Sequence, residues 1–573
     1  MQSNLRFAPA RVELARRNEN VYLRSPQTLG PHPRCVTEWL AQWSDKAPER
    51  VFLAERRGEG WRKLSYRETY GAVRRLGQAL LDRGLGPERP LAILSDNGID
   101  HALLSLAAMH VGVPAAPVSP AYSLMSKDFG KLKYIFELVR PGLVYAADPK
   151  KFAPALAAVG AKATPVEELL ETNPGSTLER EHARVGPETV AKILFTSGST
   201  GLPKGVINTQ RMLCANQQML AQAWPLVEDR PPVVLDWLPW NHTFGGNHNF
   251  NLVLRNGGTL YIDGGKPVPG LIETTAKNLS EIAPTLYFNV PRGYDLLLPF
   301  LERDAALRRK FFGELDVLFY AAAALPQNLW DRLKQLARSE NKAQLAMLSA
   351  WGSTETSPLA TSVHFPMERP GVIGLPVAGC ELKLVPLAGK LEVRVRGPNV
   401  TPGYYRRPDL TAAAFDEEGF YRIGDAVRFA DPDDPAKGIV FDGRVAEDFK
   451  LSTGTWVNVG GVRVRLIAAA DPLLADAVIT GHDRNEIGAL VFLSPTAKDA
   501  PDIRSRLSNA LKKLNRDGGS STQVRRVLVM SEPPSIDANE ITDKGYMNQR
   551  AVLARRAALV EKLYSEDPEV IRA

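Results

Sequence analysis

Residues Ile193–Val206 read ILFTSGSTGLPKGV, an apolar run that leads into hydroxyl side chains and glycines and is closed by a lysine. Glycine lets backbone N–H groups approach an oxyanion, and serine and threonine add short donors. The stretch therefore predicts a strand that runs into a phosphate-binding loop. A solvated Gly/Ser turn between two elements is the simpler interpretation, but the uninterrupted run of hydroxyls, glycines and lysine disfavours it.

The spacing excludes the Walker phosphate loop, G-x-x-x-x-G-K-[ST]. Counted from Gly198, the second glycine of that motif would fall at Pro203, and Lys204 is followed by Gly205. We therefore expect the loop to hold nucleotide phosphates in a different way.

Length and composition indicate an ordinary globular protein of several lobes. The 573 residues exceed what one core accommodates, and 24% are charged while 44% are hydrophobic. The net charge of +7 comes from scattered basic residues, without a helix-turn-helix, zinc-finger or RNA-binding signature, so no nucleic-acid partner is expected. The three cysteines are too few and too widely spaced for a disulfide framework, and we expect a cytoplasmic location.

No targeting or membrane segment is expected. Residues Met1–Arg17 are polar and basic and lack the apolar centre of a signal peptide. The most hydrophobic stretch, His101–Val118, contains His110, Gly112 and Pro114 and falls short of the roughly 20 apolar residues of a membrane span. It is typical of a buried helix followed by a buried strand.

Short apolar runs that alternate with helical patterns predict an α/β body. Leu91–Leu94 and Pro114–Val118 are expected strands on either side of a helix that starts near Asp96 and runs through Met109. Further strands are expected at Val233–Asp236, Thr259–Ile262, Leu315–Tyr320 and Gln344–Leu348.

The pattern changes after Gly371. Glu381–Val385 and Lys390–Val395 alternate apolar and polar residues, which predicts antiparallel strands with one solvated face. A polar stretch near Arg444 then leads into a tail of domain size. We predict a body over residues 1–444 and a C-terminal domain over residues 445–573.

Several other blocks carry chemically versatile side chains: WLPWNHTFGG at 237–246, AWGSTE at 350–355, FYRIGD at 420–425, DGR with Lys450 near the boundary, and TDKGY at 542–546. Each has an ordinary structural interpretation. His242 is typical of a packed histidine, and Glu355 or Asp425, the latter expected in a β-turn, is typical of a cap or turn residue. Together, in this order, the blocks are far more specific.

With these blocks the sequence resembles the adenylate-forming superfamily, which includes acyl-CoA synthetases, luciferases and peptide-synthetase adenylation domains. The resemblance extends from about Trp39 to Arg550, and the opening loop matches the signature Thr-Ser-Gly-Ser-Thr-Gly-x-Pro-Lys-Gly without substitution. The stretch WLPWNHTFGGNHNFNLVL and the ending Asn539–Tyr546 look most similar to bacterial feruloyl-CoA synthetases. The resemblance implies an α/β body with a β-rich subdomain and a small, mobile α+β C-terminal domain that rotates between two poses.

The resemblance also implies a two-step reaction. A carboxylate attacks the α-phosphate of ATP to give an acyl-adenylate and pyrophosphate, and the thiol of coenzyme A then displaces AMP. The first step joins two anions, so cations and oriented donors must stabilise it, and Mg²⁺ on the phosphate oxygens is expected. The expected partners are ATP, coenzyme A and a small carboxylic acid, and the expected state is a monomer or homodimer.

Roles carry over to the residues that match the family's motifs. The implied phosphate contacts are Thr196, Ser197, Gly198, Ser199, Thr200 and Lys204. Glu355 resembles the Mg²⁺-associated carboxylate and Thr354 the residue beside the α-phosphate, while Asp425 and Arg444 resemble the ribose contacts. His242 matches the residue at the floor between the acyl site and AMP. The other implied nucleotide contacts are Ala322 in the adenine-side wall YAAAAL, Trp351 and Lys450.

The sequence departs from the family pattern at three places. Alanines replace the glycines usual at the start of the adenine-side wall. Ala446 stands where the family has an acidic or lysine hinge, which leaves Glu447 and Asp448 as candidates. The final lysine precedes Gly545 instead of following it, and Lys544 becomes the candidate for the adenylation lysine because a lysine arm is long and flexible.

Three classes of function remain open: a CoA ligase, a stand-alone adenylation enzyme that charges a carrier protein, and a non-catalytic acyl-nucleotide binder. Within the chain, no carrier domain is expected after the C-terminal lobe, and the intact loop, Glu355 and Asp425 favour an active enzyme. The resemblance favours a hydroxycinnamate such as ferulate, with medium-chain fatty or benzoate-type acids as alternatives. Candidates for a flat acyl slot are Phe244, Asn247, Asn289 and Tyr320.

Overall fold

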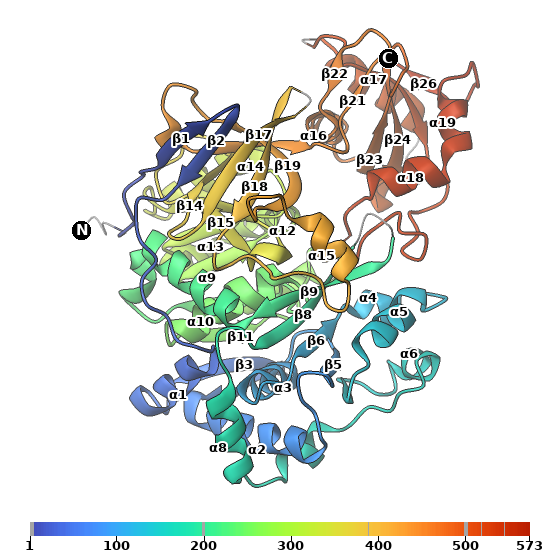
Figure 1. Ribbon diagram of the computed structural model, residues 1–573. Helices are drawn as coiled ribbons and strands as arrows, with labels where there is room; N and C mark the ends of the chain where they lie inside the picture. Colours follow the sequence, from blue (N-terminus) through green and yellow to red (C-terminus); the bar gives the residue numbers. More distant parts are fainter. Residues whose placement is uncertain (1–4, 198–200, 388, 498–501, 517, 544) are drawn as a thin grey trace.

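The computed structural model describes residues 5–197, 201–387, 389–497, 502–516, 518–543 and 545–573. Three large sheets and their helices form a body, and the last elements of the chain gather in a smaller lobe beside it (Figure 1). The predicted α/β class, with a large body and a small C-terminal domain, is confirmed.

The first sheet contains the opening motif. Its order is β7-β5-β6-β8-β9, and the first three strands are parallel. The strand predicted at Leu91–Leu94 and the extended segment at Pro114–Val118 are confirmed. The strands are β5 (Leu91–Leu94), β6 (Ala115–Val118), β7 (Leu143–Ala146), β8 (Val190–Ser197) and β9 (Pro203–Thr209).

The second sheet has the order β10-β11-β3-β4, in which β10, β11 and β3 are parallel. The strands predicted at Val233–Asp236 and Thr259–Ile262 are confirmed with the same bounds. The strands are β3 (Val51–Arg57), β4 (Gly60–Ser65), β10 (Val233–Asp236) and β11 (Thr259–Ile262).

The third sheet combines a parallel edge with an antiparallel, β-rich part. Its order is β1-β2-β17-β18-β19-β20-β16-β15-β14-β13-β12. The strands predicted near 315–320, 344–348, 381–385 and 390–395 are confirmed with shifted ends. The strands are β1 (Glu13–Arg17), β2 (Asn20–Arg24), β12 (Leu286–Asn289), β13 (Val317–Tyr320), β14 (Ala346–Gly352), β15 (Leu359–Ser362), β16 (Val372–Pro376), β17 (Glu381–Leu387), β18 (Lys390–Arg396), β19 (Tyr421–Phe429) and β20 (Ile439–Arg444).

Helices cover these sheets, and the one expected from Asp96 to Met109 forms as α3, buried on nearly every side. Helix α2 begins with a capping box in which Ser65 and Glu68 bond each other's backbone N–H. The body helices are α1 (Thr37–Lys46), α2 (Tyr66–Asp82), α3 (Ile99–His110), α4 (Pro120–Leu124), α5 (Gly130–Val139), α6 (Ala153–Ala158), α7 (Val166–Leu170), α8 (Ser176–Arg184), α9 (Gln210–Ala223), α10 (Phe250–Arg255), α11 (Ile272–Glu281), α12 (Pro291–Arg303), α13 (Ala305–Gly313), α14 (Gln327–Ser339) and α15 (Pro408–Ala414).

The C-terminal lobe has its own hydrophobic cluster, whose first member is Phe449. Because this cluster is separate from the cores of the body, we propose the domain boundary after Arg444. The lobe's elements are β21 (Phe449–Lys450), β22 (Trp456–Val457), α16 (Val459–Ala469), β23 (Leu474–Thr480), β24 (Ile487–Leu493), α17 (Ile503–Leu514), β25 (Val524–Val529), α18 (Gln549–Arg555), α19 (Ala557–Leu563) and β26 (Ile571–Arg572).

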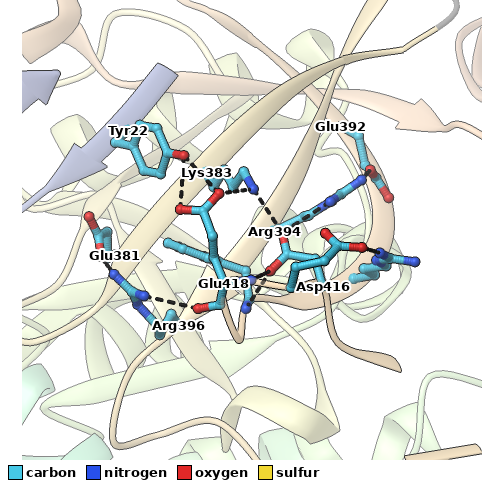
Figure 2. A network of polar contacts seen from close by, with 11 residues as sticks. Tyr22, Glu381, Lys383, Glu392, Arg394, Arg396, Asp416 and Glu418 are labelled. Carbon is cyan, nitrogen blue, oxygen red and sulfur yellow. Dashed lines mark hydrogen bonds and ion pairs between the residues drawn. The ribbon is translucent and has the colours of Figure 1, made fainter. Parts of the chain in front are cut away.

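A buried polar network ties the N-terminal hairpin to the antiparallel part of the third sheet (Figure 2). The carboxylate of Asp416 is fully buried and accepts hydrogen bonds from Lys383 Nζ and Arg394 Nη1, each at 3.0 Å. Glu418 accepts a hydrogen bond of 3.0 Å from Tyr22 in β2. Burial opposes the charge on Asp416, but these donors and the N–H of Phe420 outweigh it and lower its pKa to about 2.

Other whole-chain expectations concern cysteines and membranes. Cys35, Cys214 and Cys380 are buried and free, in agreement with the absence of a disulfide framework. Among the helices that the structure describes, none is both long and apolar enough to cross a bilayer.

Candidate functional site

The opening motif forms a hairpin. Strands β8 and β9 are antiparallel, with Thr196 opposite Lys204 and Ser197 opposite Pro203. Lys204 thus lies in a strand, although the sequence was interpreted as a loop up to the lysine, because the segment after the glycines pairs back onto β8. Gly198, Ser199 and Thr200, the predicted tip of the phosphate loop, lie outside the described residues.

Lys204 reaches toward the segment around Tyr404. The Lys204 ammonium lies 5.0 Å from the centre of the Tyr404 ring. The backbone of this segment is bound to β9, since the N–H of Tyr405 donates to Gly205 O at 2.7 Å. Tyr404 therefore joins the phosphate hairpin to the next part of the site, and no motif in the sequence had singled it out.

Glu355 lies beyond the end of β14 on a one-turn 3₁₀ helix, Thr354–Thr356, and both Thr354 and Glu355 are buried. Tyr404 Oη donates a hydrogen bond of 3.0 Å to Glu355 Oε1, and burial together with this carboxylate raises the pKa of Tyr404. The preceding Gly352 is required by packing, because a Cβ there would lie 1.6 Å from the carbonyl oxygen of Pro358. Glu355 is thus held by its surroundings and is not a solvated turn residue.

Asp425 lies inside strand β19, so its predicted position in a β-turn is wrong. Gly424 adopts a φ of +80°, and the pairing with β20 shifts register just after Asp425. The glycine that had indicated a turn therefore belongs to an irregularity within a strand. This irregularity leaves Asp425 opposite Arg444.

The Asp425 carboxylate is buried and only partly bonded. Trp351 Nε1 donates to Asp425 Oδ2 at 2.9 Å, which brings two predicted site residues together. Oδ1 accepts no hydrogen bond from the described residues, and Arg444 Nε lies 3.5 Å from it. Burial raises the pKa of Asp425 while Arg444 opposes the rise. An acceptor of this kind suits a hydroxyl donor of a ligand.

His242 precedes a π-helix, Phe244–Asn249, in the WLPWNHTFGG block. The glycine pair lets this helix approach the preceding chain, because a Cβ on Gly245 or Gly246 would lie 2.2 or 2.3 Å from the carbonyl oxygens of Leu238 and Trp240. π-Helical turns are frequent at functional sites. His242 Nε2 lies 3.3 Å from Asn241 Nδ2.

The C-terminal lobe supplies a residue to the same place. Asp543 Oδ2 lies 3.2 Å from His242 Nε2, and the Asp543 side chain is only 2% exposed. Tyr122 is buried close to Asp543, and burial together with this carboxylate raises the pKa of the Tyr122 hydroxyl. Lys544 itself lies outside the described residues. The sequence had marked the TDKGY block but had not identified Asp543 or Tyr122.

Two buried side chains donate hydrogen bonds to backbone carbonyl oxygens of the π-helix. Lys192 of β8 donates to Gly246 O at 2.7 Å, and Gln217 of α9 donates to Asn247 O at 3.0 Å. Burial lowers the pKa of Lys192 to about 7. A lysine within an apolar strand was the available signal, and sequence reasoning did not use it.

Of the residues suggested for an acyl slot, Asn247, Asn289 and Tyr320 are buried and Phe244 is half-buried, and aromatic rings lie close to them. Phe244 lies 5.7 Å from Phe319, whose ring stacks on His248 at 5.3 Å. Asn289 accepts a hydrogen bond of 3.2 Å from Trp237 Nε1. Asn247 and Tyr320 are also buried, so flat rings and a few polar groups occur together here.

Two predicted nucleotide contacts, Lys450 and Ala322, have exposed side chains. Lys450 is exposed, and its ammonium lies 5.0 Å from the ring of Trp456 in the C-terminal lobe. Ala322 is exposed with a φ of +73°, a conformation that favours glycine. None of the contacts found among the described residues joins either side chain to Glu355 or Asp425.

The hinge candidates differ in their surroundings. The Asp448 carboxylate is 3% exposed, pairs with Lys390 of β18 and accepts a hydrogen bond from the N–H of Val459 at 3.0 Å. Glu447 is half-buried. Asp448 therefore contacts both the body and the first turn of α16.

These groups fit a magnesium nucleotide. The incompletely bonded Asp425 Oδ1 suits a ribose hydroxyl, and the Glu355 carboxylate is an oxygen ligand that Mg²⁺ accepts. Among the described residues, no three His, Cys, Asp or Glu side chains are grouped to hold a metal by themselves.

Comparison with known proteins identifies the family to which the chain is similar. Residues 40–405 match the family model of the AMP-binding enzyme, and residues 450–568 match the AMP-binding enzyme C-terminal domain. The carboxylic acid reductase of Segniliparus rugosus is 26% identical over 415 residues, which is 66% of this chain and 33% of that protein. The long-chain-fatty-acid–CoA ligase of Escherichia coli is 30% identical over 262 residues, 42% of this chain and 44% of that enzyme.

The fold is shared with a solved structure, the adenylation domain of the carboxylate reductase from Mycobacterium chelonae, with a TM-score of 0.72 and 21% identity over 92% of this chain and 91% of that chain. The chain spans between a third and half of the length of the carboxylic acid reductases of S. rugosus and Mycobacterium marinum, 33% and 46% respectively. With the family model matched over most of the body and the carboxylates of Glu355 and Asp425 on neighbouring segments, the chain belongs to the AMP-binding enzyme family.

Proposed function

We propose that this protein is an ATP-dependent acid–CoA ligase that forms an acyl-adenylate and then an acyl-CoA thioester. The observation that carries the proposal is the pair of buried carboxylates in one connected cluster. Glu355 is bonded to Tyr404, Tyr404 Oη lies 3.3 Å from Tyr421 Oη in β19, and the same strand carries Asp425. These contacts connect Glu355, the proposed Mg²⁺ ligand, and Asp425, the proposed ribose acceptor, to the segment that pairs with the phosphate hairpin.

In the first half-reaction the side chains would bind and orient two anionic reactants. We assign Lys204 and the hydroxyls of the hairpin to the phosphates, Asp425 and Arg444 to the ribose, and Glu355 to Mg²⁺. Bound Mg²⁺ would neutralise phosphate charge. His242 and Thr354 would flank the reacting carboxylate and α-phosphate, and Lys544 would donate to the charge that develops between them.

For the acid we propose a hydroxycinnamate such as ferulate. Support comes from the resemblance to feruloyl-CoA synthetases and from the rings of Phe244, Phe319 and His248, against which a planar acid can pack. Asn247 and Asn289 would meet the polar ring substituents.

A second candidate is an adenylation unit that delivers its acyl group to a carrier protein or a reductase module. The similarity to carboxylic acid reductases over 415 residues favours it. The match to a fatty-acid–CoA ligase favours the CoA reaction instead.

Two assays test the proposal. Pyrophosphate release from ATP is measured with ferulate, 4-coumarate, benzoate and octanoate, and loss of free thiol from coenzyme A is then followed with the best acid. We expect release that depends on a hydroxycinnamate and a matching loss of thiol. Pyrophosphate release without loss of the coenzyme A thiol would support the second candidate, an adenylation unit that serves a carrier protein or a reductase module. No pyrophosphate release with any of the four acids would refute the proposed hydroxycinnamate ligase.

A further inference from the structure

A segment of the C-terminal lobe, residues 535–543, lies against helices α4 and α5 of the body; we name it the docking loop. In Figure 1 the stretch before α18 lies on the side of the lobe that is nearest to α4 and α5. The loop ends at Asp543, which reaches His242.

Three residues of the body bind the loop. Asp537 Oδ1 accepts from Ser126 Oγ at 2.7 Å, and Asp537 Oδ2 accepts from the N–H of Lys127 at 3.0 Å. Lys131 of α5 is buried and donates to Ile536 O at 2.8 Å and to Asn539 Oδ1 at 3.2 Å. Ile536 is buried within a hydrophobic cluster that otherwise consists of body residues.

The loop is also fixed to its own lobe. Glu540 is fully buried and accepts hydrogen bonds from Arg556 Nε at 2.6 Å and from the N–H of Ser535 at 2.9 Å. The N–H of Asn548 donates to Glu540 O at 2.8 Å, which ties the loop to the start of α18. Because one loop is bound on both sides, contacts at Lys131 and Asp537 set the position of the lobe relative to the body.

We propose that Lys131 and Asp537 are positioning residues that hold the lobe in the pose in which Asp543 meets His242, and that they serve adenylation but not thioester formation. The second part rests on the proposed function. Neither side chain contacts a proposed reacting group directly, so they act through the docking loop. In the second pose that the family resemblance implies for the attack of coenzyme A, these contacts would be broken.

The test uses Asp537→Ala and Lys131→Met in the full chain. We expect each to slow acid-dependent ATP–pyrophosphate exchange about tenfold or more, because each removes two side-chain hydrogen bonds, one partner being charged. Thioester formation from a supplied feruloyl-adenylate should stay within about twofold of the wild type, which also shows that the variants fold. Lys131→Arg, which keeps the charge and donors, should restore most of the exchange.

Matched controls come from exposed residues of the same kind. Asp483→Ala removes an exposed carboxylate of the same lobe that pairs with His482. Lys133→Met removes an exposed lysine of α5 that bonds only Asp128 O among the described residues. Both should leave exchange unchanged. Equal loss in a control and its partner variant would overturn the proposal.

The lobe position is measured separately from activity. The native cysteines are buried, so cysteines introduced at Glu137 in α5 and Arg506 in α17 can be labelled selectively for distance measurement. We expect one main distance in the wild type and a broader distribution in Asp537→Ala and Lys131→Met. Unchanged distances would overturn the proposed positioning role of Lys131 and Asp537 even if the exchange rate falls. If the wild-type protein shows no exchange with any acid, the proposed function fails, and the distances still show whether Lys131 and Asp537 fix the position of the lobe.

Discussion

His110 allows a quantitative prediction of how the free energy of unfolding depends on pH. Its side chain is buried without a charged partner, and it lies far from the proposed chemistry. It is 1% exposed at the end of α3, with Nδ1 3.1 Å from Thr37 Oγ1 and its ring stacked on His182 at 3.8 Å. Burial, and to a lesser degree the nearby His182 and arginines, lower its pKa from 6.5 to about 3.

The sign follows from proton binding. The unfolded chain takes up a proton on His110 near its ordinary pKa of about 6.5, whereas the folded chain does not until about pH 3. The stabilisation is therefore present above about pH 6.5 and is lost as the pH falls from there toward about 3. A pH of about 5 lies about 1.5 pH units below the pKa of the unfolded state. Protonation of His110 there stabilises the unfolded state relative to the folded state by about 2 kcal/mol.

The experiment compares wild type with His110→Leu by urea unfolding at about pH 7.5 and about pH 5. Other groups titrate over the same range, Asp236 and Lys192 among them, so the difference between the two proteins is the quantity that isolates His110. We expect the variant to lose about 2 kcal/mol less than wild type between the two pH values.

If wild type and His110→Leu lose the same free energy between these pH values, then His110 is already protonated in the folded protein or never buried, and the reasoning fails. A constant offset between the two proteins would report packing alone.

Three other predictions concern the proposed site and the fold. Glu355→Gln should abolish Mg²⁺-dependent pyrophosphate release without changing the thermal unfolding profile, because an amide binds Mg²⁺ poorly; release at the wild-type rate would make Glu355 a structural residue. Lys544→Ala should slow adenylation at least about 100-fold while thioester formation from a supplied acyl-adenylate survives; loss of both steps would indicate a misfolded lobe. Asp416→Ala should cost about 3–5 kcal/mol in urea unfolding, because it leaves Lys383 and Arg394 without a shared buried carboxylate (Figure 2), and an effect below about 1 kcal/mol would show that Glu418 and Glu392 replace it.

The short buried strands were predictable because apolar runs of four to six residues between helical patterns leave few alternatives. Val233–Asp236 and Thr259–Ile262 form strands with those bounds. The position of Asp425 was not predictable in the same way, because a glycine before an acid is typical both of a turn and of an irregular strand. Only the pairing of β19 with β20, a long-range contact, decides between them.

The candidate site shows the same division. Trp351, Glu355, Asp425 and Arg444 could be found from motifs, because each lies in a block that resembles a motif of the adenylate-forming superfamily. Tyr404 could not, since its role depends on the approach of its segment to β9 and on a hydrogen bond to a distant carboxylate. A tyrosine in a loop carries no local signal of such a partner.

The docking loop shows that contacts between the two lobes cannot be read from local sequence patterns. The TDKGY block was singled out for its lysine, yet the contact that the structure describes is made by the preceding Asp543, whose carboxylate meets His242 from another lobe. Periodicity and spacing report on neighbours along the chain, and they contain no information on how two lobes meet. The charge of Lys131, buried under the loop, becomes understandable only with both lobes in place, because the oxygens of Ile536 and Asn539 that accept its hydrogen bonds come from the second lobe. A buried lysine on a body helix is thus a mark of where the C-terminal lobe docks.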